Sequence, residues 1–548
     1  MHLITYLYLS LHNYTEFSGD FLCLFNSVSS EHVKKIISRS KKSFCELDML
    51  PEKMFLECND ILLPYITDIF NQSISNGLFP SDFKDSVVIP LLKKPSLDCN
   101  ILKNYRPVSN LSFVSKLLER IIFDQVIGHL GKHCLIEKFQ SAYKSCHSTE
   151  TALLRVVNDL LCSVDNGNIS VLTMLDLSAA FDTLDHQILL SRLSFVFGIK
   201  DKALSLIESY LLDRKQKIKL NNLYSQDLPI SFGVPQGSVL GPLLFTMYIY
   251  PICDVINKDI FNFHIYADDT QLYNFYKPDE VNNAISDISN STSEINNWMK
   301  SNKLKMNADK TEVMFCGSNQ RLNNVNICSI DIDDDLIDVS SSVRNLGFFL
   351  DKNLNMNVHV TNLRKSCYNE IRKISHVRPF INEQCTIKLV ISLVLSKLDY
   401  CNCIMYGMSE NNFYKLQLIQ NHAARIVKKA PKHSSASDLL FELHWLPIRQ
   451  RVSYKIALTV FKCLHVDDFP SYLKELISTY TPSRNLRSSN QYLLTKPFKK
   501  LNTFGKKSFH YAAPEVWNSL PLDLRSCSSL PLFKRNLKTH FFKLAFYN

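Results

Sequence analysis

Glycine is scarce in this chain, with 13 in 548 residues, which is about 2% against a usual share of about 7%. Sharp turns that need glycine are therefore few, and we expect helices to dominate. No run approaches the roughly 18 uncharged apolar residues of a membrane-spanning helix, so we expect no membrane partner. The apolar stretch 3–11 lacks the basic residues of a secretory signal, and we expect the chain to begin inside a larger gene product.

The sequence also lacks a disulfide pattern, although it has 16 cysteines. They lie singly along the chain, which favours reduced thiols in an intracellular protein. Cys401 and Cys403 form the closest pair, but no second Cys or His pair follows at zinc spacing. We expect neither a disulfide framework nor a zinc site.

Charge is distributed unevenly. Residues 361–548 hold 29 Lys and Arg against 11 Asp and Glu, a net +18, whereas residues 1–360 hold 33 against 41, a net −8. This contrast fits carboxylate chemistry in the first part and a bound polyanion in the second. A basic surface that is only solvated is the alternative.

Hydrophobic periodicity predicts an α+β fold of several domains. The predicted strands are 87–92, 169–175, 215–220, 228–232, 261–266, 271–275, 313–316 and 346–350, and the predicted helices include 112–130, 201–212, 240–256, 280–300 and most of 357–464. Residues 470–510 are rich in Ser, Asn, Thr and Lys, which predicts a linker.

Three carboxylates mark the ends of predicted strands. Asp176 ends the strand 169–175, and Asp268 and Asp269 form the tip of a hairpin much later in the chain. If these strands are neighbours, the carboxylates converge and become suited to Mg²⁺, which prefers a few carboxylate oxygens with phosphate and water. Two such ions stabilise the attacking and leaving oxygens of an in-line displacement, which predicts two-metal nucleotidyl transfer. The alternative is that Asp268 and Asp269 form a solvated turn.

Six segments in a fixed order add to this pattern. They are NYRPVSNLSFVSKLLERII (104–122), FQSAYKSCHSTETAL (139–153), VLTMLDLSAAFDTLDH (171–186), GVPQGSVLGPLLF (233–245), YADDTQL (266–272) and LKMNADKTEVMFCG (304–317). With these segments the chain resembles the reverse transcriptases of LINE-type, non-LTR retrotransposons of the jockey-like group. The resemblance implies an RNA-directed DNA polymerase that uses two Mg²⁺ ions, with Mn²⁺ as an alternative ion, and that binds an RNA template, a DNA primer or RNA:DNA duplex, and dNTPs.

The resemblance also implies a right-hand fold of fingers, palm with an antiparallel sheet, and helical thumb, followed by a helical basic C-terminal region. We assign residues 1–84 to an N-terminal helical extension and 85–352 to fingers and palm. Residues 353–470 are then the thumb, and 471–548 are a linker and C-terminal basic region.

The catalytic residues implied by the resemblance are Asp176, Asp268, Asp269 and Lys310. The three aspartates and the carbonyl of Leu177 are the implied metal ligands. Lys310 is the implied cation that protonates or neutralises the departing pyrophosphate, and a plain surface lysine is the alternative.

Five further residues are implied to bind substrate. Phe181 corresponds to a bulky gate against the ribose 2′-hydroxyl, with a core aromatic as the alternative. Gln236 and Gly237 are placed near the nascent base pair. Arg106 and Lys144 are candidates for the triphosphate, although the family more often has arginine where this chain has Lys144, and lysine lacks bidentate geometry.

The sequence shows no segment that fits the endonuclease of intact relatives, and none that fits an RNase H domain. The stretch before Asp48 is too short for an endonuclease, and the acidic residues of 361–548 are too dispersed for RNase H. We expect both to be lacking. The alternative function is a catalytically inactive or truncated element product that binds RNA only. Nuclear rather than cytoplasmic residence is implied by analogy alone.

Overall fold

The computed structural model describes residues 15–178, 180–256, 260–323, 325, 327–332, 335–482, 491–498 and 503–547. The apolar stretch 3–11 lies outside these residues. The chain divides into two compact units, each assembled from separate stretches of sequence. The first unit comprises residues 1–137, 177–257 and 293–307, and the second comprises 138–176, 258–292 and 308–548. The fold is mixed α and β.

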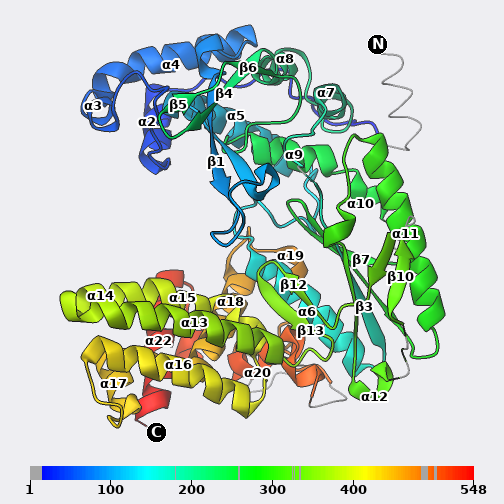
Figure 1. Cartoon of the computed structure of the whole chain (residues 1–548), viewed down its shortest axis with the longest axis vertical. Coiled ribbons are helices and arrows are strands. Elements are labelled where there is room, and N and C mark those ends of the chain that lie inside the picture. Colours follow the sequence, from blue (N-terminus) through cyan, green and yellow to red (C-terminus); the bar gives the residue numbers. More distant parts are fainter. Residues whose placement is uncertain are drawn as a thin grey trace. The chain divides into compact units, whose positions relative to one another are not determined.

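The first unit combines a small sheet with helices (Figure 1). Its helices are α2 (Ser30–Arg39), α3 (Glu52–Glu57), α4 (Asn59–Asn76), α5 (Phe113–Lys132), α7 (His186–Phe195), α8 (Asp201–Leu211), α9 (Gly241–Ile249) and α10 (Ile252–Val255), with the 3-10 turns η1 (Ser81–Phe83) and η2 (Leu102–Asn104). The strands are β1 (Ser86–Leu92), β2 (Tyr105–Asn110), β4 (Arg214–Leu220), β5 (Leu223–Tyr224) and β6 (Leu228–Ile230). The sheet order is β2-β1-β4-β5, with β6 also paired to β4.

A buried carboxylate connects two helices of this unit. The side chain of Glu119 on α5 is fully buried and accepts hydrogen bonds from the backbone N–H groups of Val239 (2.7 Å) and Leu240 (3.0 Å). These donors lie directly before α9, where a helix leaves N–H groups without intrahelical partners. Burial raises the pKa of Glu119. The two backbone bonds go to Oε2, whereas the buried Oε1 has no hydrogen-bond partner among the described residues.

The loop before α9 is fixed by glycine. Gly237 has φ +126°, and a Cβ at this position would lie 2.6 Å from the carbonyl oxygen of Ser109 on β2. The Ser109 N–H in turn donates to the Gln236 carbonyl at 2.8 Å. Glycine is therefore required here by the chain's own backbone, whether or not a template strand also approaches it.

The second unit contains the main antiparallel sheet. Its strands are β3 (Ile169–Leu175), β7 (Asn262–Tyr266), β8 (Asp269–Tyr276) and β9 (Glu312–Cys316), in the order β7-β8-β3-β9, with the hairpins β10 (Ser329–Ile332) with β11 (Asp335–Asp338) and β12 (Ser342–Asn345) with β13 (Phe348–Asp351). The helices are α6 (Thr149–Asp165), α12 (Asn319–Leu322), α13 (Asn357–Val377), α14 (Glu383–Val390), α15 (Ser396–Asp399), α16 (Glu410–Lys428), α17 (Ala436–Glu442), α18 (Ile448–His465), α19 (Ser471–Lys474), α20 (Phe509–Asn518), α21 (Leu522–Arg525) and α22 (Leu530–Phe546). The short turns are η3 (Ala308–Lys310), η4 (Arg378–Phe380), the π-helical η5 (Ile391–Leu395), η6 (Asn402–Met405) and η7 (Gly505–Lys507). Helix α11 (Val281–Ser301) begins in the second unit and ends in the first.

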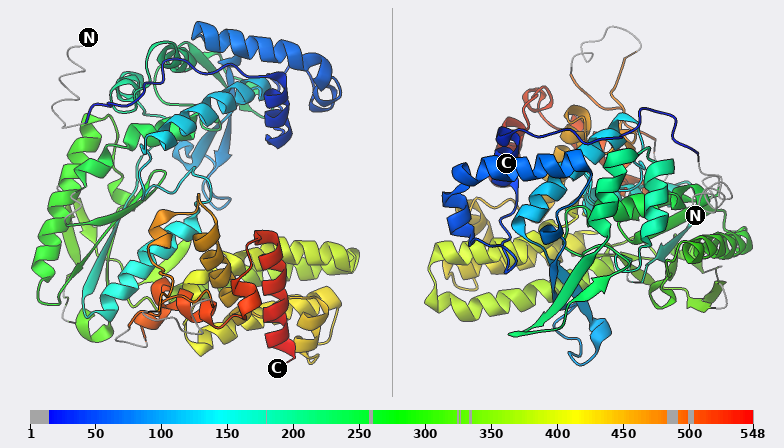
Figure 2. Two further views of the ribbon diagram at one scale, coloured as in Figure 1. Left: turned by 180° about the vertical axis from the view of Figure 1, so that it is seen from behind. Right: turned by 90° about the horizontal axis from the view of Figure 1, so that it is seen from above.

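One hydrophobic core extends through the second unit. It runs from α6 and the sheet, through α13, α16 and α18, to α20 and α22. Helix α6 packs against β3 and β7 (Figure 2). This helix starts at a capping box, in which Ser148 and Thr151 bond each other's backbone N–H groups, as its Ser-Thr-Glu-Thr sequence predicts.

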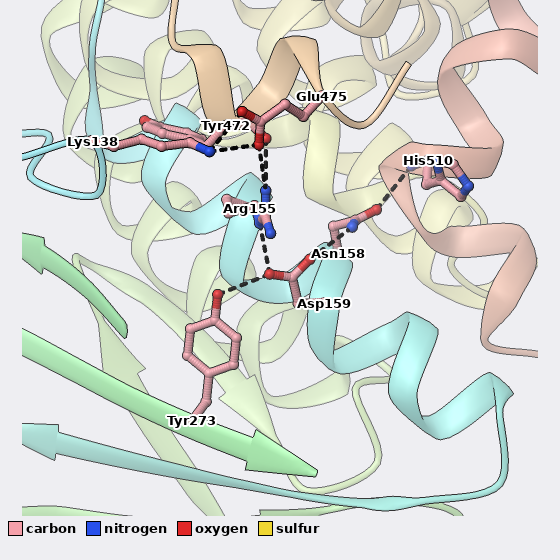
Figure 3. Close-up of polar contacts among 8 residues, drawn as sticks. All are labelled: Lys138, Arg155, Asn158, Asp159, Tyr273, Tyr472, Glu475 and His510. Carbon is pink, nitrogen blue, oxygen red and sulfur yellow. Dashed lines mark hydrogen bonds and ion pairs between the residues drawn. The ribbon is translucent and has the colours of Figure 1, made fainter. Parts of the chain in front are cut away.

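A buried polar network ties the sheet to later helices (Figure 3). Asp159 on α6 accepts a hydrogen bond from Arg155 Nε at 2.7 Å and another from the Tyr273 hydroxyl of β8 at 2.8 Å. Arg155 also donates to the carbonyl of Tyr472 in α19 at 2.9 Å. Because the Arg155 and Asp159 side chains are only 17% and 13% exposed, each charge depends on the other.

Most of the predicted elements are present, with two corrections. The predicted helix 240–256 is interrupted at Tyr250 and Pro251, because proline has no N–H to continue the hydrogen-bond ladder, and forms α9 and α10. The predicted linker 470–510 includes α19, whose Tyr472 and Leu473 are fully buried. The linker was predicted from the polar composition of the whole stretch 470–510, which gave these two apolar residues little weight. Within the described ranges, none of the helices combines the length and apolar character that a bilayer crossing requires.

Replacing the glycine of the α9 loop tests its steric role. We expect Gly237→Ala to destabilise the protein by about 1–3 kcal/mol, because a non-glycine residue is strained at this φ and its Cβ meets the Ser109 carbonyl. Gly128→Ala is the control, since an added Cβ in α5 meets nothing within 4 Å. The thermal unfolding midpoint checks both variants, and equal midpoints would contradict the assignment.

Removing the carboxylate of the buried network tests its contribution to stability. We expect Asp159→Ala to destabilise the protein by about 2 kcal/mol, because the largely buried Arg155 loses its close carboxylate partner and keeps only the half-exposed Glu475, at 4.0 Å. Glu57→Ala is the matched control: Glu57 also pairs at i,i+4 spacing, with Lys53, but both side chains are exposed, so the loss should stay below about 0.5 kcal/mol. If Glu57→Ala lowered the thermal unfolding midpoint as much as Asp159→Ala, the buried network would contribute nothing to stability.

Candidate active site

The register of the main sheet brings two aspartates together. Strand β3 pairs antiparallel with β8, and Leu175 lies opposite Thr270. The next residue on one strand, Asp176, therefore lies beside the preceding residue on the other, Asp269. Two positions that are distant in sequence thus share one end of the sheet, which fulfils the condition on which the predicted convergence depended.

The third aspartate comes from the hairpin turn. Tyr266 on β7 pairs with Asp269 on β8, so that Ala267 and Asp268 form a two-residue loop. Ala267 has φ +57°, the left-handed conformation that such tight hairpin turns require. This turn fixes Asp268 next to Asp269 at the same end of the sheet.

The aspartates are crowded electrostatically. Burial, followed by the charges of Asp268 and Asp176, raises the pKa of Asp269 to about 6, while Lys310 acts in the opposite direction. Like charges placed together disfavour the ionised form of each group. The cluster is therefore one that a neighbouring cation stabilises.

Lys310 supplies positive charge to this cluster. Its Nζ lies 2.6 Å from Oδ2 of Asp176, and it ends the turn η3 directly before β9, the strand that pairs with β3. The lysine side chain is 61% exposed and that of Asp176 is 19% exposed. The structure therefore places Lys310 beside Asp176.

The donor chemistry of this edge fits a hard divalent cation, because the side chains supply carboxylate oxygens. The described residues nevertheless contain no group of three or more His, Cys, Asp or Glu side chains arranged to hold a metal by themselves. Mg²⁺ binds commonly through one or two carboxylates together with substrate phosphates. The edge is thus suited to ions that share their coordination with a nucleotide.

The segment containing Lys144 runs beside β7. Ser141 N–H donates to the Ile265 carbonyl at 3.0 Å, and the buried side chain of Gln140 accepts hydrogen bonds from Ala142 N–H and, at 3.4 Å, Ala267 N–H. Lys144 itself is partly buried. The structure thereby assigns Gln140 a role in shaping the hairpin turn, which sequence reasoning missed although the residue lies in a recognised segment.

Tyr143, the residue before Lys144, was also missed. It is 47% exposed, and its backbone has φ +61°. Burial of part of the side chain and the neighbouring charge of Asp268 raise the pKa of its hydroxyl. Tyr143 therefore lies within electrostatic range of Asp268.

Phe181 and Gln236 lie in the first unit, with their loops joined. The ring of Phe181 stacks on Phe245 of α9, with centroids 4.8 Å apart, and its carbonyl accepts from Val234 N–H at 2.9 Å. Gln236 Nε2 donates to both carboxylate oxygens of Asp182 at 2.9 Å. The two predicted substrate residues are thus held by one pair of loops.

Two aspartates of this region have different roles. Asp185 accepts from the N–H groups of Gln187 and Ile188 and caps α7, as expected for an aspartate before a helix. Asp182 instead accepts hydrogen bonds from Gln236. Its side chain bonds to the neighbouring loop that carries Gln236 and does not cap a helix.

Three predicted site residues remain to be placed. Arg106 lies on β2 of the first unit, where its side chain is exposed. Gly237 belongs to the loop before α9, described above. Leu177 follows Asp176 in the chain and pairs with Met306 in an isolated bridge of the first unit. The structure therefore groups the aspartates with Lys310 and the Lys144 segment in one unit, and the other candidates in the other.

Comparison with known proteins identifies the family that this part of the chain matches. Residues 92–350 match the family described as reverse transcriptase (RNA-dependent DNA polymerase). The chain is 26% identical over 427 residues to the "RNA-directed DNA polymerase from mobile element jockey" of Drosophila melanogaster, covering 76% of this chain and 45% of that protein.

Two further relatives from Drosophila melanogaster give the same result. The "Probable RNA-directed DNA polymerase from transposon BS" is 26% identical over 71% of this chain and 43% of its own length. The corresponding protein from transposon X-element is 25% identical over 66% and 40%. The chain thus spans less than half the length of these curated relatives. Residues 92–350 form a domain of the reverse transcriptase (RNA-dependent DNA polymerase) family, of the kind found in jockey-like non-LTR retrotransposons.

Proposed function

We propose that this chain is an RNA-directed DNA polymerase of a jockey-like non-LTR retrotransposon, which extends a DNA primer along an RNA template with dNTPs. The observation that carries the proposal is the sheet register, which joins Asp176 to Asp269 and, through the hairpin turn, to Asp268. The family match and the names of the relatives support it.

In this proposal residues 85–352 act as fingers and palm, and the sheet β7-β8-β3-β9 is the palm sheet. Residues 353–470 act as the thumb. Residues 1–84 are an N-terminal extension, and 471–548 are a basic C-terminal region. Lys499 and Lys500, which contribute to that basic charge, lie outside the described residues.

Asp176, Asp268, Asp269 and the Leu177 carbonyl would hold two Mg²⁺ ions, or Mn²⁺ in their place. Such ions stabilise both the attacking 3′-hydroxyl and the departing pyrophosphate of an in-line displacement. The crowding that raises the pKa of Asp269 supports this assignment, because bound cations offset like charge. Lys310, already beside Asp176, is placed to neutralise or protonate the departing pyrophosphate.

The remaining residues bind the nucleotide and template. Lys144 and Arg106 neutralise triphosphate charge, with Lys144 acting as a point charge rather than a bidentate partner. Phe181 excludes a ribose 2′-hydroxyl. Gln236 and Gly237 contact the nascent base pair, and the hydrogen bond of Gln236 to Asp182 fixes the orientation of the amide.

Primer extension on poly(rA)/oligo(dT) with Mg²⁺ tests the proposed chemistry. We expect Asp268→Asn to reduce incorporation of dTTP by at least about a thousandfold, because loss of an anionic ligand removes several kcal/mol of charge stabilisation in the transition state. Asp185→Asn is the control. Asparagine caps a helix as well as aspartate does, so activity should persist.

Two results would defeat this assignment: an inactive wild-type protein, or an Asp268→Asn variant as active as the wild type. An inactive protein that still binds RNA in a salt-sensitive manner would instead favour the alternative function, a truncated element product that binds RNA only.

Nucleotide selection tests the role of Phe181. We expect Phe181→Val to reduce discrimination against ribonucleotides by roughly tenfold or more, because a smaller side chain leaves room for the 2′-hydroxyl. Phe245→Val is the matched control, since Phe245 forms the other half of the stacked pair and is fully buried. The ratio of kcat/KM values for dTTP and UTP is the measurement. Equal ratios in both variants would identify Phe181 as a core aromatic.

A further inference from the structure

A groove of about 780 Å³ lies outside the reverse transcriptase match, in the second unit. It is lined by the second half of α13, the turn η4, the end of α16 and the loop that follows. Helices α13 and α16 pack side by side (Figure 1). We refer to this feature as the α13–α16 groove.

The α13–α16 groove is strongly cationic. Arg378, Arg425, Lys429 and Lys432 line it, and none of the described lining residues is acidic. Lys429 and Lys432 are exposed. Four positive charges that line one groove attract a polyanion, which relieves their mutual repulsion.

The two arginines donate hydrogen bonds to backbone carbonyls rather than to carboxylates. Arg378 donates to the backbone carbonyls of Ile426, at 3.0 Å, and Val427, at 2.8 Å. Arg425 donates to the Ser434 carbonyl at 3.2 Å, while its buried Nε has no hydrogen-bond partner among the described residues. Arg378 also donates to the Ile381 carbonyl at 2.7 Å, so all three of its guanidinium nitrogens bond neutral acceptors. Both guanidinium groups therefore keep their positive charge, and Arg425 retains a nitrogen without a partner among the described residues.

Aromatic rings accompany these cations. Tyr368 and His422 line the groove, and the tyrosine hydroxyl lies 3.0 Å from Nδ1 of the histidine. Phe380 follows the lining residue Pro379 and is 86% exposed. Burial, together with the charges of Arg425 and Lys432, lowers the pKa of His422, which favours a neutral ring. Flat rings beside cations are the features that bind unpaired bases and their phosphates.

We propose that the α13–α16 groove binds a single-stranded segment of nucleic acid, with phosphates on Arg425, Lys429 and Lys432 and a base against Tyr368, while the buried Arg378 adds positive charge from beneath. A concave site of this size suits a strand whose bases are unpaired rather than a duplex. An acidic peptide would satisfy the cations but would leave the rings unused. The site does not depend on the polymerase proposal, because it lies outside residues 92–350 and requires neither metal nor dNTP.

Fluorescence anisotropy tests the site directly. The full-length chain carrying Asp268→Asn is titrated into labelled ten-nucleotide oligo(U), and separately oligo(dT), in EDTA without nucleotides. We expect the double variant Lys429→Gln/Lys432→Gln to bind roughly tenfold more weakly at 100 mM KCl. Its plot of log affinity against log salt should be shallower by about 1.4, because each contact to a single strand contributes about 0.7.

The control is Lys41→Gln/Lys42→Gln, which removes two exposed lysines of the first unit and the same charge. It should bind as the parent does. An equal loss in both double variants, or a loss in neither, overturns the proposal. Unfolding midpoints that match the parent show that the groove variant is folded, and Lys432→Gln alone provides a milder change with a slope shallower by about 0.7.

The aromatic part of the site has its own test. Tyr368→Leu should weaken binding by roughly tenfold through loss of base stacking, whereas Tyr368→Phe keeps the ring and should bind as the parent does. The tighter of oligo(U) and oligo(dT) identifies the strand as RNA or DNA. Displacement of either oligonucleotide by poly-glutamate of equal charge, at equal concentration, would overturn recognition of nucleic acid. Because binding is measured on an Asp268→Asn protein, a failure here leaves the polymerase proposal unaffected.

Discussion

The pairing of β3 with β8 is the constraint on which the candidate site depends. A shift of one residue in this register would turn the side chains of one strand to the opposite face and would move Asp176 away from Asp269. The register is fixed by seven pairs, from Ile169 with Tyr276 to Leu175 with Thr270, and β3 is buried along its whole length. The hydrophobic core therefore determines where the carboxylates lie.

Gathering carboxylates at the end of a buried sheet is unfavourable by itself, and the surrounding structure offsets this in two ways. Lys310 provides a cation against Asp176. Away from the carboxylates, Tyr273 anchors β8 to Asp159 and, through Arg155, to the α19 segment (Figure 3). Residues beyond the reverse transcriptase match thus help to hold the strand that carries Asp269. The sheet and the later helices of the second unit thus share one hydrophobic core and this polar network.

Local patterns predicted the elements around the site because their causes are local. Strand β3 is an uninterrupted apolar run, and the acidic hairpin tip lies between two such runs, so each was visible in a short window of sequence. The capping serine of α6 and the capping Asp185 of α7 were visible for the same reason. Gln140, Tyr143 and the Asp182–Gln236 bond were missed, because their partners are distant in sequence and leave no periodic signal.

The sequence by itself determined the order of strands and helices, the resemblance to a polymerase family, and the identity of the three aspartates, since these depend on residue type and short spacing. Only the tertiary structure decided that Asp176 faces Asp269, that Lys310 contacts Asp176, and that the apparent linker at Tyr472 packs into the core. The same holds for the cationic groove between α13 and α16, whose charges come from segments that fold side by side. The physical reason is that long-range pairing is set by the combined burial of many apolar side chains, which no single window of sequence contains.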